Sequence, residues 1–456
     1  MTAAAAGLAF FAGLSWAAAP AKPPRLTITL EQAQRAALAH SPILKAAESD
    51  LAAAQEQADA RFSQILPRVT LDGTWQYQTV VPTFAPAPGA PAVPFGSHRS
   101  YSAGPTFSYT LWDGGSLLNA WRSQRVMAGS REAQRELVRR QVLFLSRFDY
   151  FQVQLALEQE RSQADSLRLA EAQYRDINSR FLAGSASRID WLSAHEQVLG
   201  RRRDLRSAQA DVASALRALF ALMGQGQDAD VSAPVDARIA QPPPSGLGAP
   251  TVQVELEPLE SVEAKLEPAA SASLDEGYPQ VLVYSRQAES LRMSAKSVSA
   301  GEWPRVQAFF RSDYLYPNLP LLESAWQNVG GASVSVPFLE FGRTRREARA
   351  QRDLADAAAR QRDEALDELD RDWHKARDQY AALRWQEALD RESVEETAEI
   401  ARLRYSSYRN GGSTILDVET ANLDAVEARV TAARRRTQVL IQLATLDSLS
   451  AVKENP

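Results

Sequence analysis

The chain has 456 residues, 45% of them hydrophobic, so it is long enough to bury several cores. It contains no cysteine, which excludes disulfides, thiolate metal sites, a catalytic thiol and a lipidated N-terminal cysteine. The net charge of −5 gives no support for nucleic-acid binding. No apolar run after the N-terminal stretch approaches the ~20 residues that a transmembrane helix needs.

Residues 1–19 differ in composition from the rest of the chain. Ala3 to Ala19 is apolar and ends in Ala17-Ala18-Ala19-Pro20, a pattern typical of an apolar region followed by a small-residue cleavage site. We expect a secretory signal peptide at 1–19; the alternative is an alanine-rich leader. The usual positive charge near Met1 is missing, which leaves the true start codon open. Export without cysteine fits the periplasm or outer membrane of a Gram-negative cell.

The remainder reads as two copies of one succession of elements. Glycines and aspartates superpose at a single shift of 227 residues, namely Gly115 on Gly342, Gly184 on Gly411 and Asp190 on Asp417. An internal repeat without gaps over this stretch indicates a duplicated structural unit.

The first repeat, 26–224, is expected to hold a helix, strands at about 67–81 and 100–112, a long helix at 116–183 and a return helix at 188–223. The second repeat, 273–450, is expected to hold a helix, strands at about 304–316 and 329–339, a long helix at 343–410 and a return helix at 414–449. Residues 225–272, which contain Pro242-Pro243-Pro244, are expected to form a linker with at most short structure. A helix of 68 residues reaches about 100 Å, too long for one compact globule.

The predicted strands alternate between apolar and polar residues. In the first strand Val69, Leu71, Trp75 and Tyr77 share one face, and polar residues occupy the other. This pattern fits a membrane barrel and also a half-buried soluble sheet. Four strands cannot close a barrel around a channel, and an open sheet edge is excluded from lipid. If these strands meet lipid, several chains must therefore share one barrel.

The long helices carry one narrow apolar stripe. Phe144, Phe148, Phe151 and Leu155 recur at a mean spacing near 3.5, as in a coiled-coil seam, and Leu366, Leu369 and Trp373 begin a similar series. The rest of each helix is rich in Arg, Glu, Asp, Gln and Ala. Such helices pack on neighbours and keep a wide face in water. Periodicity alone leaves open a soluble periplasmic coiled-coil scaffold without any channel.

Three pairs of motifs recur at corresponding places in the two repeats. They are Pro67-Arg68-Val69 with Pro304-Arg305-Val306, Leu111-Trp112-Asp113-Gly114-Gly115 with Phe338-Leu339-Glu340-Phe341-Gly342-Arg343, and Phe181-Leu182-Ala183-Gly184 with Tyr408-Arg409-Asn410-Gly411. In their order and duplication, over nearly the whole mature chain, they resemble the TolC-type outer membrane efflux proteins, the outer membrane factors of tripartite export systems.

The resemblance implies a mostly helical fold with a β-barrel part. A homotrimer would form a 12-stranded outer membrane barrel from four strands per chain, and its helices would form a long tube through the periplasm. The chain would be a passive exit channel, not an enzyme, and would receive substrate from a periplasmic adaptor and an inner-membrane transporter. Multidrug efflux, metal efflux and type I secretion are not separable on this basis.

The resemblance also implies a gate at the helix tips. Asp190 and Tyr408 fall where a carboxylate–phenol hydrogen bond would join helix pairs, and Asp417 falls at a constriction where three carboxylates would favour cations. The family pattern is incomplete, because Ser413 and Thr420 replace a possible arginine and a second aspartate. Alternatively, Asp190 and Asp417 offset the dipoles at helix starts. The tip turns, expected to contact the adaptor, contain Gly184, Ser185, Gly411 and Gly412.

No other constellation points to chemistry. The four histidines are scattered without metal-ligand spacing, and neither a nucleophile elbow nor a phosphate loop is present. We therefore expect no catalytic residue, no metal site, no cofactor and no nucleic-acid partner. The partners that we expect are outer membrane lipid, further copies of the chain, the periplasmic adaptor and the inner-membrane transporter.

Overall fold

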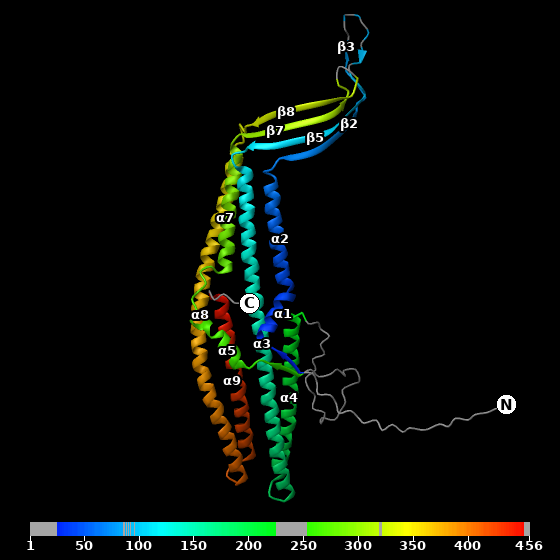
Figure 1. Cartoon of the computed structure of the whole chain (residues 1–456). Coiled ribbons are helices and arrows are strands. Elements are labelled where there is room, and N and C mark those ends of the chain that lie inside the picture. The colour runs from blue at the N-terminus through cyan, green and yellow to red at the C-terminus, as the bar shows by residue number, and fades with distance from the viewer. Residues whose placement is uncertain are drawn as a thin grey trace, which may run out of the picture. The chain divides into compact units, whose positions relative to one another are not determined.

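A computed structural model describes residues 25–84, 87, 89, 91, 93, 94, 96–224, 253–318 and 322–450 (Figure 1). The expected signal peptide at 1–19 lies outside these residues, as does 225–252 of the expected linker. The chain divides into two compact units. Unit 1 comprises Met1–Ala39, Ser146–Lys265 and Trp385–Leu440, and unit 2 comprises His40–Leu145, Leu266–Arg384 and Ile441–Pro456.

Helices make up most of the described chain. The two long helices, α3 (Ser116–Leu182) and α8 (Arg343–Arg409), have 67 residues each, and their return helices, α4 (Arg188–Leu222) and α9 (Ile415–Leu449), have 35 each. The expected ends of these helices differ from the observed ones by at most one residue. No helix in the described ranges combines the length and the apolar character needed to cross a membrane.

Shorter helices precede the strands. In unit 2 these are α2 (Pro42–Ser63), α6 (Pro268–Ser271), α7 (Pro279–Ser299) and the 3-10 turn η1 (Ala300–Glu302); in unit 1 they are α1 (Leu30–His40) and α5 (Leu259–Leu266). Proline opens both α2 and α7, where its missing N–H costs nothing. The hydroxyl of Ser41 caps α2 by accepting from the Leu44 N–H at 3.3 Å.

Unit 2 contains one antiparallel sheet of four strands in the order β2-β5-β7-β8. The strands are β2 (Arg68–Tyr77), β5 (Arg99–Trp112), β7 (Arg305–Tyr316) and β8 (Ala325–Ser335). The last strand lies four residues earlier than the expected 329–339, because Pro337 has no N–H to continue the ladder. A short hairpin, β3 (Thr83–Phe84) with β4 (Val93–Pro94), was not expected from the sequence.

The register sorts the sheet residues onto two faces. Val69 stands opposite Phe107, which stands opposite Phe310, and Trp75 stands opposite Tyr101. The same face continues on β8 through Trp326, Gly330, Ala332 and Val334. Large side chains on this face are exposed in the single chain, and Leu71 retains 82% of its accessible surface. The opposite face carries mainly Ser, Thr, Gln, Arg and Asp, so one four-stranded sheet presents an apolar and a polar side.

A second, smaller sheet in unit 1 joins the starts of the two repeats. Strand β1 (Arg25–Ile28) pairs in parallel with β6 (Gln253–Leu256), and Arg25 stands opposite Gln253. This offset of 228 lies one residue from the repeat shift of 227. The second repeat therefore begins at β6, inside the segment that the sequence indicated as a linker.

Tyr150 of α3 joins these two strands at their ends. Its hydroxyl donates to the Ile28 carbonyl and accepts from the Glu257 N–H, both at 3.0 Å, and its side chain is fully buried. Burial raises the pKa of Tyr150 to about 12. The predicted seam included Phe148, but that side chain retains 36% of its accessible surface, whereas Tyr150, which was not in the predicted seam, is fully buried. The reason is that α3 packs here against β1 and β6, which helix periodicity does not reveal.

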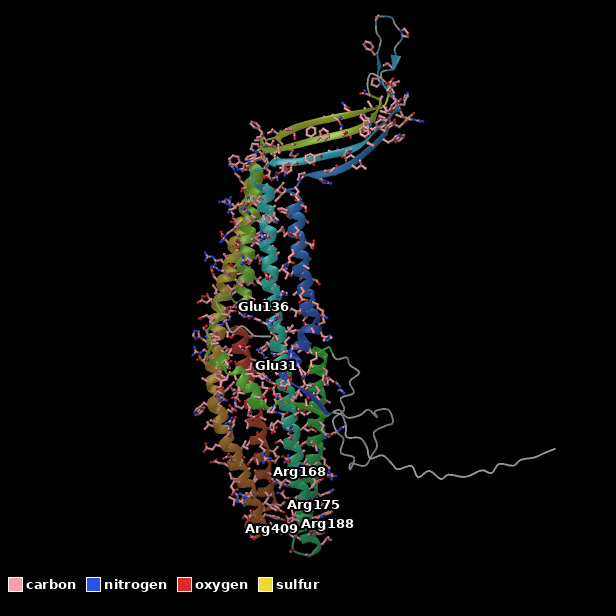
Figure 2. The ribbon with its side chains drawn as sticks, in the orientation of Figure 1. Glu31, Glu136, Arg168, Arg175, Arg188 and Arg409 are labelled. Atoms are coloured by element: carbon pink, nitrogen blue, oxygen red, sulfur yellow. The ribbon has the colours of Figure 1, made fainter. Side chains whose placement is uncertain are left out.

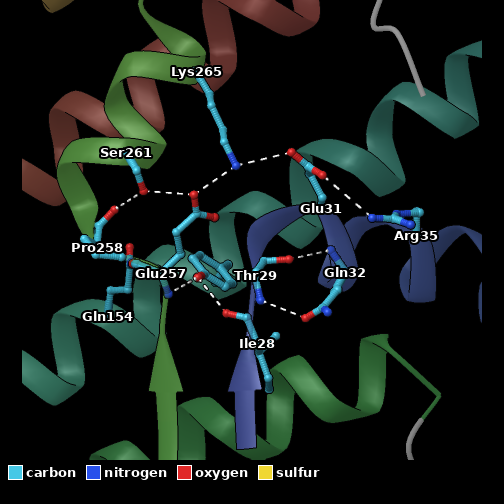
Figure 3. A network of polar contacts seen from close by, with 11 residues as sticks. Ile28, Thr29, Glu31, Gln32, Arg35, Gln154, Glu257, Pro258, Ser261 and Lys265 are labelled. Atoms are coloured by element: carbon cyan, nitrogen blue, oxygen red, sulfur yellow. Dashed lines mark hydrogen bonds and ion pairs between the residues drawn. The ribbon is translucent and has the colours of Figure 1, made fainter.

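A polar network surrounds this sheet (Figure 3). Lys265 on α5 contacts a carboxylate oxygen of Glu31 on α1 at 3.2 Å and one of Glu257 at 2.9 Å. Ser261 donates to Glu257 at 2.8 Å. Lys265 therefore connects the first helix of one repeat to the first helix of the other.

The cores are narrow and lie along the helices. In unit 2 Leu369 packs with Val281 and Ala365, while Trp373 packs with Ala269 and Leu446. Buried alanines are frequent along α8, among them Ala348, Ala355, Ala358 and Ala365. Small residues let neighbouring helices approach closely, which leaves most of the remaining helix surface to polar side chains.

Candidate functional site

Two glycine turns close the α3/α4 and α8/α9 hairpins in unit 1. Gly184 and Gly411 adopt φ values of 75° and 79°, the left-handed conformation that ends many helices. The N–H of Ser185 donates to the Arg180 carbonyl at 2.8 Å, and that of Gly412 donates to the Ser407 carbonyl at 2.9 Å. Both tips are thus Schellman caps with the same backbone hydrogen bonds.

Each return helix begins with a capping box. The Asp190 N–H donates to the Ser187 hydroxyl at 3.1 Å, and the Asp190 carboxylate accepts from the Ser187 N–H at 3.4 Å. The Asp417 carboxylate accepts from both the N–H and the hydroxyl of Thr414 at 2.8 Å. These hydrogen bonds with Thr414 lower the pKa of Asp417, so it stays charged at neutral pH. Both aspartates therefore have the helix-start role that the sequence left as an alternative.

The structure brings Asp190 and Tyr408 together, whereas the Asp417 carboxylate binds Thr414. Tyr408, near the end of α8, is half-buried and lies close enough to Asp190, at the start of α4, for the two side chains to interact. Burial raises the pKa of Tyr408, and the charge and hydrogen bond of Asp190 raise it further. The phenol therefore remains a donor at neutral pH, and the pair joins one hairpin to the other.

A second phenol–carboxylate pair lies one turn away and was missed in the sequence. The Tyr405 hydroxyl donates to Asp176 of α3 at 2.9 Å, and Arg180 contacts the same carboxylate oxygen at 3.4 Å. Arg180 also donates to the Arg409 carbonyl at 3.3 Å. Burial raises the pKa of Tyr405, and the hydrogen bond to Asp176 raises it further.

A simple signal would have found this pair. Tyr405 and Asp176 are 229 positions apart, as are Arg409 and Arg180, and both separations are close to the repeat shift. Residues at equivalent heights on the two hairpins are neighbours in unit 1. Testing charged and phenolic pairs near that shift would have singled out Tyr405.

The remaining side chains at the tips differ between the hairpins. Trp191 of α4 donates to Asn178 at 2.9 Å and stacks on Phe181 at 5.7 Å between ring centroids. Behind them Ile177, Ala194 and Ile415 form a small buried cluster. Arg188 and Arg409 are exposed near the tips (Figure 2).

A cavity of about 310 Å³ lies among the four helices of unit 1. Its walls include Leu169, Gln173, Arg201, Tyr405, Glu419 and Val426. Burial raises the pKa of Glu419, and the charge of Arg201 opposes that shift. Apolar walls beside a few polar groups suit an apolar side chain or a small amphipathic molecule. Within the described ranges no cluster of acidic or histidine side chains could hold a metal ion.

Comparison with protein families decides the identity of this duplicated architecture. Residues 34–225 and 281–452 match the outer membrane efflux protein family. The chain belongs to this family. The efflux-protein resemblance inferred from the motifs is thereby confirmed, as is the mostly helical fold with a strand part.

Several solved structures share the fold of this efflux protein. CusC, described in connection with transmembrane channel formation, is 15% identical over 92% of both chains, with a TM-score of 0.72. The outer membrane protein VceC of Vibrio cholerae is 16% identical over 92% of this chain and 95% of that one, with a TM-score of 0.72. The CmeC outer membrane channel of Campylobacter jejuni is 16% identical over 93% and 87%, with a TM-score of 0.70. The search among curated proteins found no match.

Proposed function

We propose that three copies of this outer membrane efflux protein form a passive exit channel of a tripartite export system. Each chain supplies four strands to a 12-stranded barrel in the outer membrane, and the helices extend into the periplasm as a tube. A periplasmic adaptor and an inner-membrane pump deliver the substrate and provide the energy. The channel itself carries out no reaction.

The observation that carries this proposal is the four-stranded sheet. Its apolar face leaves Val69, Leu71, Trp75 and Trp326 exposed in the single chain, an area that a water-soluble monomer would not sustain. Its edge strands β2 and β8 have no partner on their outer side within the described residues. Lipid can cover the apolar face, but only another strand can form the backbone hydrogen bonds that the two edge strands lack. Pairing of β8 with β2 of a second copy, repeated three times, satisfies both requirements.

The gate is proposed to lie at the tips of the hairpins. Asp190 and Tyr408 join the two hairpins of one chain, and Tyr405 with Asp176 adds a second link one turn away. Opening the tube requires the hairpins to separate, which breaks both hydrogen bonds. A hydrogen bond to a charged group contributes about 1.5–3 kcal/mol, so two per chain can hold a closed state that an adaptor later opens.

Asp417 is proposed to line the narrowest point. It is exposed and charged, and three copies around one axis would attract cations and slow their passage. Asp417 also caps α9, and the two roles are compatible because the cap engages one carboxylate oxygen, Oδ2. The turns at Gly184, Ser185, Gly411 and Gly412 are the proposed adaptor contacts, flanked by exposed Arg188 and Arg409.

Conductance of purified protein in planar bilayers tests these roles. We expect a trimer in detergent, small closed-state conductance and block by divalent cations. Asp417→Ala should weaken cation block and cation preference, and Tyr408→Phe should raise leak. Asp367→Ala, which removes an exposed carboxylate in the middle of α8, is the matched control. A monomer that stays in water without detergent would favour a periplasmic scaffold and refute the channel; unchanged selectivity in Asp417→Ala would refute only the constriction.

A further inference from the structure

The junction between β8 and α8 contains a strained and exposed phenylalanine. Phe341 has φ of 49°, the only left-handed residue other than glycine in the described part of the chain. This conformation costs a side-chain-bearing residue about 1–2 kcal/mol. Its side chain retains 84% of its accessible surface, so packing within the chain does not offset the strain. Strain of this kind is a sign of function.

The equivalent junction of the first repeat lacks this feature. Gly114 occupies the position of Phe341 and has φ of 67°, so the backbone is similar. A Cβ at Gly114 would lie 2.9 Å from the Cβ of Trp303, which leaves no space for a side chain. The second junction is open, and its Phe338 retains 98% of its surface.

Arginines follow immediately, and they are denser here than at the start of α3. Arg343, Arg345, Arg346 and Arg349 lie in the first two turns of α8, whereas the equivalent positions in α3 are Ser116, Leu118, Asn119 and Arg122. Arg343 contacts Glu340 at 2.8 Å and Arg345 contacts Glu302 at 2.9 Å. Arg346 and Arg349 are exposed and have no ion pair in the part of the chain that the structure describes.

The exposed apolar residues continue one face of the sheet. Val334 belongs to the apolar face by its register with Val306. Val336 and Phe338, which follow directly after the end of β8, are also exposed. Exposed apolar side chains therefore continue from the face proposed to meet lipid to the start of the arginines. Apolar side chains beside arginines are the arrangement expected where hydrocarbon meets phosphate headgroups.

We propose that residues 338–349 form a lipid-headgroup anchor, in which Phe338 and Phe341 enter the acyl boundary and Arg346 and Arg349 bind the phosphates of anionic phospholipids. This rests on the proposed placement of the sheet in the membrane. Guanidinium groups bind phosphate through paired hydrogen bonds, and each basic residue near an anionic surface adds about fivefold to affinity. A second copy of the chain could also cover this surface, but interface cores are depleted of charge, and four arginines in seven positions argue against it.

The chain contains no cysteine, so a single label can report on this surface. Phe341→Cys carrying a nitroxide is reconstituted as trimer into vesicles of phosphatidylcholine with phosphatidylglycerol. The relaxation of the label by two reagents is measured separately. Oxygen concentrates in lipid, and a polar nickel reagent stays in water. We expect high oxygen and low nickel accessibility. High nickel accessibility, or protection from both reagents as in a contact with a second copy, would overturn the anchor. Asp367→Cys provides the water-exposed reference.

Lipid retention supplies an independent readout. Native mass spectrometry of R346Q/R349Q should show phosphatidylglycerol affinity reduced about 25-fold, with phosphatidylcholine binding unchanged. Arg360→Gln, an exposed arginine three turns further along α8, should leave both unchanged. An equal loss of phosphatidylglycerol affinity in Arg360→Gln would overturn the anchor. Oligomeric state and conductance of the same preparations separate the hypotheses: a conducting trimer without lipid selectivity refutes only the anchor, and the absence of trimers refutes the channel.

Discussion

The two strand-to-helix junctions share a backbone path and differ in their surroundings. In the first, Asp113 accepts from the Gly115 N–H at 2.9 Å and the Leu117 N–H at 2.7 Å, and Gly114 lies against Trp303. In the second, Glu340 accepts from the Thr344 hydroxyl and from Arg343, and Phe341 lies in open space. Duplication preserved the turn, while the neighbours decided which side chains it could carry.

The hairpin tips show the same divergence. The first hairpin carries Asn178 and Phe181 beside Trp191, and the second carries Tyr405 and Tyr408 at the positions equivalent to Asn178 and Phe181. The phenols of these two pairs thus come from the second hairpin, and the carboxylates, Asp176 and Asp190, come from the first. Identical tips could not form this donor–acceptor pairing.

Gly114→Ala should show the largest difference between the junctions. The new Cβ suffers both the left-handed backbone and the contact with Trp303, and we expect a loss of about 2–4 kcal/mol. Gly342→Ala meets nothing within 4 Å and should lose only about 1 kcal/mol. Thermal dissociation of the detergent-purified proteins measures both. Equal losses would show that the contact with Trp303 does not restrict the side chain at position 114.

Tyr405→Phe should have the next largest effect, and it acts at the tips. Removal of the hydroxyl leaves Asp176 with Arg180 alone, so the cost is about 1–2 kcal/mol, mainly as an easier separation of the hairpins. Leak conductance should rise, and should rise further when Tyr408→Phe is added. Tyr109→Phe, on a strand of the sheet, is the control for loss of a hydroxyl. Leak at the wild-type level in both tip variants would remove Tyr405 from the gate.

Much of this divergence could not be predicted from periodicity. Helix ends and the number of strands in the main sheet followed from glycine turns, proline positions and alternation, which are local signals. The four-residue strands β1 and β6 are too short to alternate visibly, and their partners lie 228 positions apart. The burial of Tyr150 in place of Phe148 depends on that distant pairing. The Asp190–Tyr408 pair could be predicted from the family resemblance. The Tyr405–Asp176 pair could be predicted only from its separation of 229 positions, which is close to the repeat shift.

Acidification should loosen the contact between the starts of the repeats. Burial alone raises the pKa of Glu257, but hydrogen bonds from Lys265 and Ser261 outweigh it and leave that pKa lowered. The hydrogen bond that Lys265 donates to Glu257 raises the pKa of Lys265. The stabilisation by the Glu257 carboxylate is therefore complete at pH values above the ordinary pKa of 4.5. It is lost as the pH falls through the lower pKa that this carboxyl has in the folded chain. The stability from Lys265 is lost only as pH rises above 10.5.

Hydrogen exchange across β1 and β6, corrected for intrinsic rates, measures this effect. Protection should fall in the wild type as the pH drops below about 4.5. In Glu257→Gln protection should be lower at pH 7 and should no longer change as the pH drops below that value. Glu56→Gln, on an exposed part of α2, should behave as the wild type. A pH response that persists without the Glu257 carboxyl would assign it to another group.

Phe341→Gly should have the smallest effect on stability, and with the opposite sign to Gly114→Ala. Relief of the left-handed strain stabilises the folded chain by about 1–2 kcal/mol. The greater freedom of glycine in the unfolded chain destabilises the folded chain by about 0.5–1 kcal/mol. In detergent we expect the variant to dissociate at the same temperature as the wild type or slightly above it. In vesicles containing phosphatidylglycerol it should be less stable than the wild type, because the lost apolar contact is then made by lipid. A residue that is unfavourable in detergent and favourable in lipid has a role in the membrane; if the two media gave the same sign, the strain at Phe341 would need another explanation.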